Sequence, residues 1–129
     1  MRLAYVDTSV LVAIAFGEPG AEQLARHLAD FDERVSAALT EAEVRAAFAR
    51  EEVPFAPALI ASLSWILPRR LLSSEIDSVL DAGHLRGADL WHVACALYVS
   101  PVPAAVTFAT LDARQRVVAS ALGFPLLPV

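Results

Sequence analysis

The sequence contains no lysine, so all ten of its basic residues are arginine. Arginine binds phosphate through paired hydrogen bonds from one planar group. Acidic residues outnumber basic ones by 15 to 10, which gives a formal charge of −5. This balance argues against a protein that binds nucleic acid through a broadly positive surface. It leaves open an enzyme that meets phosphate groups through metal ions.

Cysteine and long apolar segments are also scarce. The single cysteine, Cys95, excludes an internal disulfide and fits a reducing cytoplasm. No apolar run reaches the roughly 18 residues of a membrane helix, and residues 1–7 lack the apolar core of a signal peptide. We therefore predict a cytoplasmic protein with no membrane partner.

Apolar side chains, in contrast, are abundant. They make up 57% of the 129 residues, and residues 1–129 are predicted to form one domain. An apolar excess without a membrane segment also suggests an interface with a partner protein.

Short apolar segments alternate along the chain with segments of helical periodicity. The pattern predicts strands at residues 3–6, 34–38 and 104–109, and brief strands at 71–72 and 126–127. It predicts helices at residues 10–16, 21–30, 40–52, 58–67, 73–82, 88–98 and 112–122. In the helix at 73–82 we expect Ile76, Val79 and Leu80 to point inward. The alternation is typical of an α/β domain, in which helices cover both faces of a parallel sheet.

The segment at residues 88–98 is apolar on nearly every side, which is typical of a helix buried all round. It nevertheless carries Asp89 near its beginning. A buried carboxylate is costly unless it is paired, hydrogen-bonded or bound to a metal. Something in the fold should therefore compensate Asp89.

Three other acids occupy comparable positions. Asp7 and Asp112 follow predicted strands, and Glu43 lies early in a predicted helix, as Asp89 does. In parallel sheets, ligands bind beyond the carboxyl ends of the strands. The sequence therefore predicts that Asp7, Glu43, Asp89 and Asp112 gather at that edge.

Gathered carboxylates need a cation. Two of them about 5 Å apart repel each other by roughly 3 kcal/mol at an effective dielectric near 20. Oxygen ligands select hard ions such as Mg²⁺ or Mn²⁺, and no cluster of cysteine or histidine suits zinc. Such an ion activates water and stabilises the charge that develops on a phosphodiester.

Each acid also has a simpler interpretation. Asp7 could cap a helix, although we favour the metal role because it directly follows a buried strand. Glu43 could complete a capping box with Thr40, and Asp112 could do so with Gln115. For Asp112, spacing alone favours neither role over the other.

His92 lies one helical turn after Asp89, so it could orient that carboxylate or contact substrate. A satisfied core histidine is an equally good interpretation. The arginines that could supply positive potential to a bound phosphodiester are Arg69, Arg70, Arg114 and Arg116.

Taken together, the motifs resemble the PIN-domain family, specifically the VapC-like toxins of type II toxin–antitoxin modules. The resemblance covers essentially the whole chain and rests on four segments in sequence: Tyr5-Val6-Asp7-Thr8-Ser9-Val10-Leu11-Val12, Leu39-Thr40-Glu41-Ala42-Glu43-Val44, Leu85-Arg86-Gly87-Ala88-Asp89-Leu90-Trp91-His92-Val93-Ala94 and Thr107-Phe108-Ala109-Thr110-Leu111-Asp112.

The resemblance implies a parallel sheet of about five strands and an endoribonuclease that uses Mg²⁺ or Mn²⁺ to hydrolyse RNA with activated water. It implies catalytic roles for Asp7, Glu43, Asp89 and Asp112. Asp7 and Asp89 would be the most direct metal ligands and Asp112 a further one, while Glu43 would bind metal or position water. It also implies a homodimer that a VapB-like antitoxin holds inactive.

Two other functions compete with this interpretation. A phosphatase with an aspartyl nucleophile commonly carries an Asp-x-Asp motif, but Ser9 occupies the second position here. A non-catalytic module that binds nucleic acid or protein would have no need of four intact acids.

Overall fold

A computed structural model describes all residues, 1–129, as a single α/β domain. Its strands form one parallel sheet in the order β3-β2-β1-β4. The strands are β1 (Leu3–Val6), β2 (Glu33–Ala37), β3 (Ser64–Ile66) and β4 (Val106–Ala109). The α-helices are α1 (Thr8–Ala15), α2 (Ala21–Ala29), α3 (Leu39–Arg50), α4 (Ser73–Ala82), α5 (Gly87–Val99) and α6 (Ala113–Leu122), and short 3₁₀ helices span Pro57–Leu59 and Pro103–Ala105.

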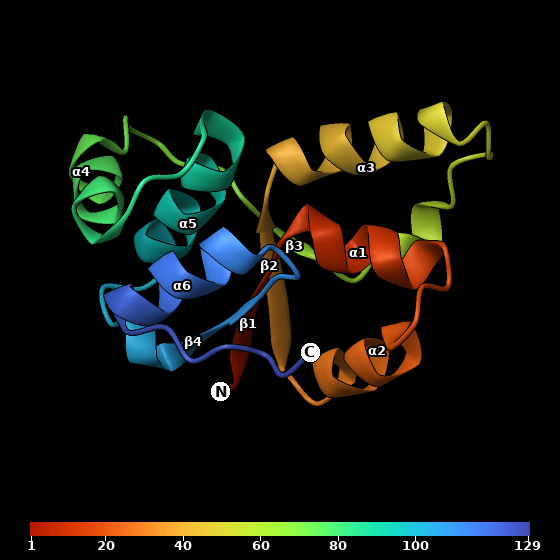
Figure 1. The fold of residues 1–129 in the computed structure, drawn as a ribbon, viewed down its shortest axis with the longest axis horizontal. Helices are drawn as coiled ribbons and strands as arrows, with labels where there is room; N and C mark the ends of the chain where they lie inside the picture. The colour runs from red at the N-terminus through yellow and green to blue at the C-terminus, as the bar shows by residue number, and fades with distance from the viewer.

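Helices cover both faces of the sheet, as predicted. Helices α1, α2 and α3 lie on one side and α4, α5 and α6 on the other (Figure 1). The side chains of β1 alternate between the two cores, because successive residues of a strand point to opposite faces. Val6 packs among the side chains of α1–α3, whereas Tyr5 packs among those of α4–α6.

The sheet has four strands rather than five, because the final predicted strand is reduced to one bridge. Leu126 pairs in parallel with Phe108 at the outer edge of β4 but continues no further. The brief strand predicted at residues 71–72 is wrong. Leu72 is buried and directly precedes α4, while Leu71 is 85% exposed.

The helix predicted at residues 58–67 is also wrong. Only Pro57–Leu59 is helical, and Ser64–Ile66 instead forms β3, which pairs with β2. A short apolar run does not distinguish a strand from a buried helix by its periodicity. The paired strand satisfies backbone groups of β2 that would otherwise stand at an open edge.

Two burial predictions need correction. Leu80 points outward and is 44% exposed, because it lies one residue beyond the inward stripe that contains Val79. Helix α5 is buried over residues 92–96, while Asp89 and Trp91 near its beginning are only partly buried. None of the helices is both long enough and apolar enough to cross a membrane.

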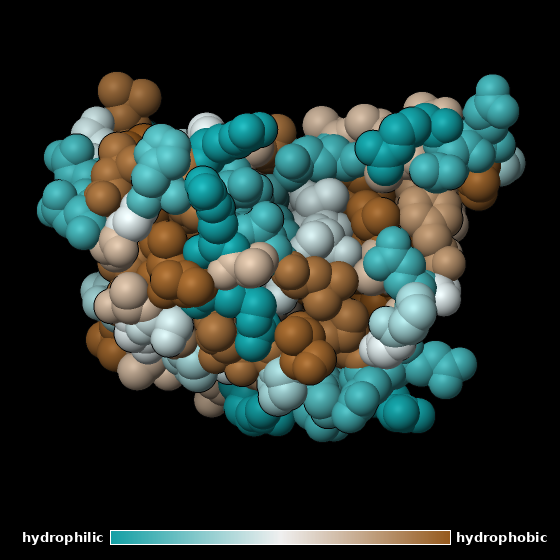
Figure 2. All heavy atoms as spheres, in the orientation of Figure 1, coloured by the Kyte–Doolittle hydropathy of each residue, from teal (hydrophilic) through white to brown (hydrophobic).

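The parallel strands all end at the same edge of the sheet. Figure 1 shows that α1, α3 and α6 begin near this edge, on either side of the sheet. In the same orientation, Figure 2 shows hydrophilic side chains gathered in the middle of the face, around the beginnings of these helices.

Candidate active site

Asp7 stands directly after the central strand β1 and is only 5% exposed. It is the N-cap of α1, so the capping interpretation is confirmed. Its Oδ2 accepts hydrogen bonds from Ser9 Oγ at 2.7 Å and Ser9 N at 3.3 Å, and Thr110 Oγ1 lies 3.0 Å away. Its Oδ1 accepts no hydrogen bond and lies 3.5 Å from His92 Nε2, so this oxygen is held less firmly than Oδ2.

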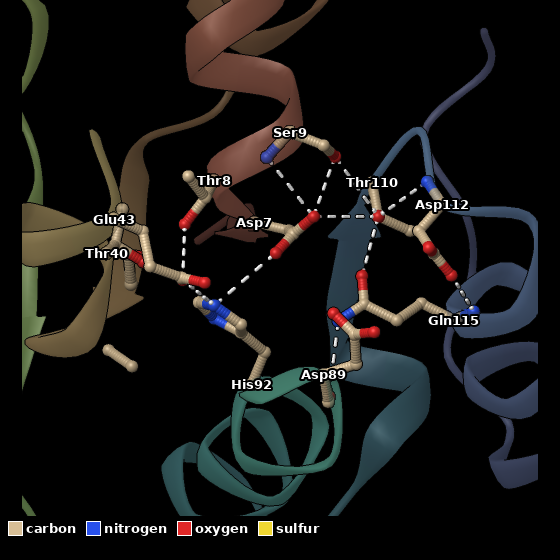
Figure 3. Close-up of polar contacts among 12 residues, drawn as sticks. Asp7, Thr8, Ser9, Thr40, Glu43, Asp89, His92, Thr110, Asp112 and Gln115 are labelled. Atoms are coloured by element: carbon tan, nitrogen blue, oxygen red, sulfur yellow. Dashed lines mark hydrogen bonds and ion pairs between the residues drawn. The ribbon is translucent and has the colours of Figure 1, made fainter. Parts of the chain in front are cut away.

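Glu43 projects from the second turn of α3 towards Asp7 and His92 (Figure 3). The capping box predicted with Thr40 does not form, because α3 begins at Leu39 and the Thr40 hydroxyl bonds to Ser36 Oγ at 2.6 Å. The Glu43 carboxylate instead accepts from Thr8 and lies 2.7 Å from His92 Nε2. The hydrogen bond with His92 is the main reason that the pKa of Glu43 lies below its ordinary value.

His92 is 1% exposed and bonds to Glu43 rather than to Asp89. Its other ring nitrogen lies 2.6 Å from the hydroxyl of Tyr5 on β1. Burial raises the pKa of the Tyr5 phenol well above its ordinary value, so the phenol keeps its proton at neutral pH. The possibility that His92 orients Asp89 is therefore not supported.

Asp89 lies in the first turn of α5, and no protein group donates a hydrogen bond to its carboxylate. Its expected full burial is not observed, since the residue is only partly buried. Its pKa is nevertheless raised, first by desolvation and then by the negative charges of Asp112 and Asp7, with a smaller contribution from Glu43. Asp89 is thus the least compensated carboxylate of the four.

Asp112 caps α6, because its Oδ1 accepts from Gln115 N at 2.8 Å. The reciprocal half of the predicted capping box is missing. The Gln115 side chain is fully buried and turns away, so that its Nε2 donates to the backbone oxygen of Asp89 at 3.2 Å. Gln115 therefore ties the beginning of α6 to the beginning of α5.

The hydroxyl of Thr110 joins the two halves of the site. Its oxygen accepts from Asp112 N at 3.0 Å. Its single proton has three candidate acceptors, Gln115 Oε1 at 2.7 Å, Asp7 Oδ2 at 3.0 Å and Ser9 Oγ at 3.4 Å. The prediction from sequence missed Thr8, Ser9 and Thr110 as hydrogen-bond partners of the acids and Tyr5 as the partner of His92. It named Gln115 only as the second half of a capping box with Asp112. Thr8 and Ser9 directly follow Asp7, and Thr110 directly follows β4.

The four predicted acids come from different segments and face one edge of the sheet. Figure 3 shows Glu43 and Asp112 on opposite sides of Asp7, with Asp89 across from it. As they lie, no three histidine, cysteine, aspartate or glutamate side chains form a ready metal-binding group. The donor set still fits a hard divalent cation, because carboxylate oxygens dominate it and the Asp89 carboxylate has no other partner.

The four arginines considered for RNA binding differ in their contacts. Arg116 donates to the backbone oxygens of Thr110 and Leu127, so it braces the end of β4. Arg70 forms an ion pair with Glu75 at 2.6 Å. Arg69 and Arg114 are exposed and form no ion pair.

Comparison with known protein families gives one match. The model of the PIN domain matches residues 4–121, a range that includes all four acids and the whole sheet except Leu3, the first residue of β1. Neither the curated proteins nor the solved structures gave a match. PIN domains are a superfamily of nucleases that usually depend on metal ions, which agrees with the carboxylate edge described above. The chain belongs to the PIN domain family.

Proposed function

We propose that this PIN domain is a metal-dependent endoribonuclease of the VapC type, the toxin of a VapBC-like toxin–antitoxin module. One observation carries the proposal: Asp7, Glu43, Asp89 and Asp112 meet at the carboxyl edge of the sheet, and Asp89 has no hydrogen-bond donor there. The VapC assignment itself is supported by the four sequence segments that resemble those toxins.

The proposed metal ligands are Oδ1 of Asp7, which accepts no hydrogen bond, and the carboxylates of Asp89 and Asp112. When bound, Mg²⁺ or Mn²⁺ would lower the pKa of a water molecule and offset charge on the scissile phosphate. Glu43 has one oxygen held by Thr8 and His92, which suits it to orient water or complete the metal site. Ser9 and Thr110 hold Asp7 in place.

The proposed partners are an RNA substrate, a second copy of the chain and a VapB-like antitoxin, all in the cytoplasm. Exposed apolar side chains support protein partners, since Leu67 is 69% and Leu71 is 85% exposed. The RNA would approach the hydrophilic middle of the face in Figure 2.

The test is to incubate the purified protein, freed of any antitoxin, with mixed cellular RNA and Mg²⁺ or Mn²⁺. An Asp89→Asn variant and a chelator serve as controls. Discrete RNA fragments that disappear in both controls would support a metal-dependent ribonuclease, and sequencing the fragment ends would identify the target. Equal cleavage by Asp89→Asn would show that the site assignment is wrong.

Two further results would favour the competing functions. Hydrolysis of p-nitrophenyl phosphate without RNA cleavage would indicate a phosphatase. Tight binding of RNA that needs no metal and leads to no cleavage would indicate a binding module.

A further inference from the structure

A buried chain of hydrogen bonds runs from the backbone of β2 to the carboxylate of Glu43. The Ala37 N–H donates to the hydroxyl of Tyr5 at 3.2 Å, and this hydroxyl lies 2.6 Å from His92 Nδ1. The opposite ring nitrogen, His92 Nε2, lies 2.7 Å from Glu43 Oε1. Tyr5 and His92 are 0% and 1% exposed, so solvent does not supply alternative partners.

The contacts of this chain favour one arrangement of its protons. The Tyr5 oxygen accepts from Ala37 N, and His92 Nδ1 lies 2.6 Å from the same hydroxyl as an acceptor for its proton. With Nδ1 as an acceptor, the ring proton of neutral His92 lies on Nε2, which faces Glu43 Oε1 at 2.7 Å. This tautomer is the one that the proposal requires.

The consequence for Glu43 is that its two carboxylate oxygens differ in their hydrogen bonds. Oε1 accepts from both Thr8 Oγ1, at 2.8 Å, and His92 Nε2. Oε2 has no hydrogen-bond partner in the protein, and the side chain of Glu43 is 32% exposed. His92 Nε2 also lies 3.5 Å from Asp7 Oδ1, so the ring separates the two acids at a set distance.

We propose that His92, held by Tyr5, is a positioning residue that locks Glu43 Oε1 and leaves Oε2 as the oxygen that serves the active site. The catalytic part of this proposal rests on the proposed ribonuclease function. The positioning part rests on geometry alone. A merely space-filling histidine would need neither the donated proton nor the phenol behind it.

The first test is ¹⁵N NMR of the imidazole in the metal-free protein. We expect His92 to show the Nε2–H form with slow solvent exchange, and Tyr5→Phe to produce a mixture of the two tautomers. Tyr98→Phe is the matched control, because that hydroxyl contacts only Arg69 N and lies outside the chain. An Nδ1–H form in the parent, or no change in Tyr5→Phe, would overturn the proposal.

The second test is kinetic. His92→Leu should lower kcat for RNA cleavage about 10- to 100-fold, the usual range for partners that orient a metal-site ligand. KM should change little, because His92 does not contact substrate. His92→Gln keeps an N–H near Nε2 and should recover part of the loss. A folded His92→Leu protein with the kcat of the parent would show that the positioning role is wrong.

The two tests separate this proposal from the proposed function. If the parent cleaves no RNA under any metal condition, the ribonuclease assignment fails. The NMR result then decides alone whether Tyr5 and His92 hold Glu43. Loss of the slow exchange in Glu43→Ala would support that contact, and unchanged exchange would contradict it.

Discussion

The carboxylates of the site receive very different support from the protein. Asp7 has hydrogen bonds from Ser9 on one oxygen, and Glu43 is held by Thr8 and His92, but the Asp89 carboxylate has no donor. An uncompensated carboxylate near other acids destabilises the fold when no cation is bound. In the proposed function, Asp89 is therefore a residue at which function is gained at the expense of stability.

We expect Asp89→Asn to raise the melting temperature of the metal-free protein. The gain should be a few degrees, since a partly exposed charge contributes at most about 1 kcal/mol. The pKa of Asp89 is raised, so its penalty is absent at low pH and grows as the pH rises through that pKa. The difference between variant and parent should therefore be larger at pH 8 than at pH 4 in thermal melts with chelator.

The matched control for this change is Asp77→Asn, on the exposed side of α4. Adding Mn²⁺ should stabilise the parent and the control but not Asp89→Asn, because ligand binding raises the stability of the folded state alone. Equal stabilisation of all three proteins would place the metal elsewhere.

Asp112 has an observed capping role and a proposed metal-binding role, and substitution can separate the two. Asn caps helices as well as Asp does, so Asp112→Asn should retain the stability of the parent, whereas Asp112→Ala should lose about 1 kcal/mol. Both changes remove the charge and should reduce RNA cleavage. Urea titration measures the first effect and the cleavage assay the second. Full activity in Asp112→Asn would leave Asp112 with the capping role only.

Among the elements, α4 and α6 approach each other very closely. A Cβ atom built on Gly83, at the end of α4, would lie 2.8 Å from Val118 Cγ2 on α6. Real Cβ atoms do not come this close, so the Val118 side chain, α4 or α6 would have to shift. The contact also helps to hold α6, which carries Asp112 at its beginning.

Gly83→Ala should therefore destabilise the protein by about 1–3 kcal/mol, the usual cost of forcing an extra methyl into a packed contact. Gly87→Ala, at the first residue of α5, is the control, because its Cβ would meet nothing within 4 Å. Val118→Ala should recover part of the loss in the Gly83→Ala background. Urea denaturation measures all three, and equal stability of Gly83→Ala and the parent would refute the tight contact.

The elements also show which features the sequence can predict. Strand β1 was predictable because its apolar run ends directly before Asp7. Helix α5 was predictable because its apolar segment is long and has Asp89 near its beginning. Strand β3 was not, because its three residues lie in an apolar run between Pro57 and Pro68 that has no clear period. Whether such a run becomes helix or strand is decided by the free edge of β2, which the local sequence does not contain.

The same limit applies to the site. The acids could be placed at one edge because each directly follows a strand or begins a helix. The partner of His92 could not be predicted, since the ring lies between Glu43, 49 residues away, and Tyr5, 87 residues away in sequence. Contacts at such separations depend on the packing of whole helices across the sheet.

At the scale of the molecule, the proposed binding of RNA requires local positive charge on a chain whose formal charge is −5. Arg70 and Arg116 are committed to contacts within the protein. Arg86 precedes α5 and Arg114 lies in the first turn of α6, so both stand beside acids of the site, and both are exposed. We expect these two to supply positive charge for the phosphate backbone.

Removing Arg86 and Arg114 should weaken RNA binding and flatten its dependence on salt. Each lost contact with single-stranded RNA should lower the slope of log K against log salt by about 0.7. Arg50→Ala is the control, because Arg50 is exposed at the end of α3, beside Glu51. An unchanged slope in the double variant, measured with Ca²⁺ or without metal, would contradict this role.

The connection of β1 to β4 has a consequence for biosynthesis. Asp7 N donates to Ala109 O at 2.9 Å, and Thr110 contacts the Asp7 carboxylate across 103 residues of sequence. During translation, Asp7, Glu43 and Asp89 all leave the ribosome before the strand that completes their edge. A nascent chain therefore carries three of the four candidate acids before β4 gives them their final arrangement. The edge that holds these acids is complete only after β4 has left the ribosome.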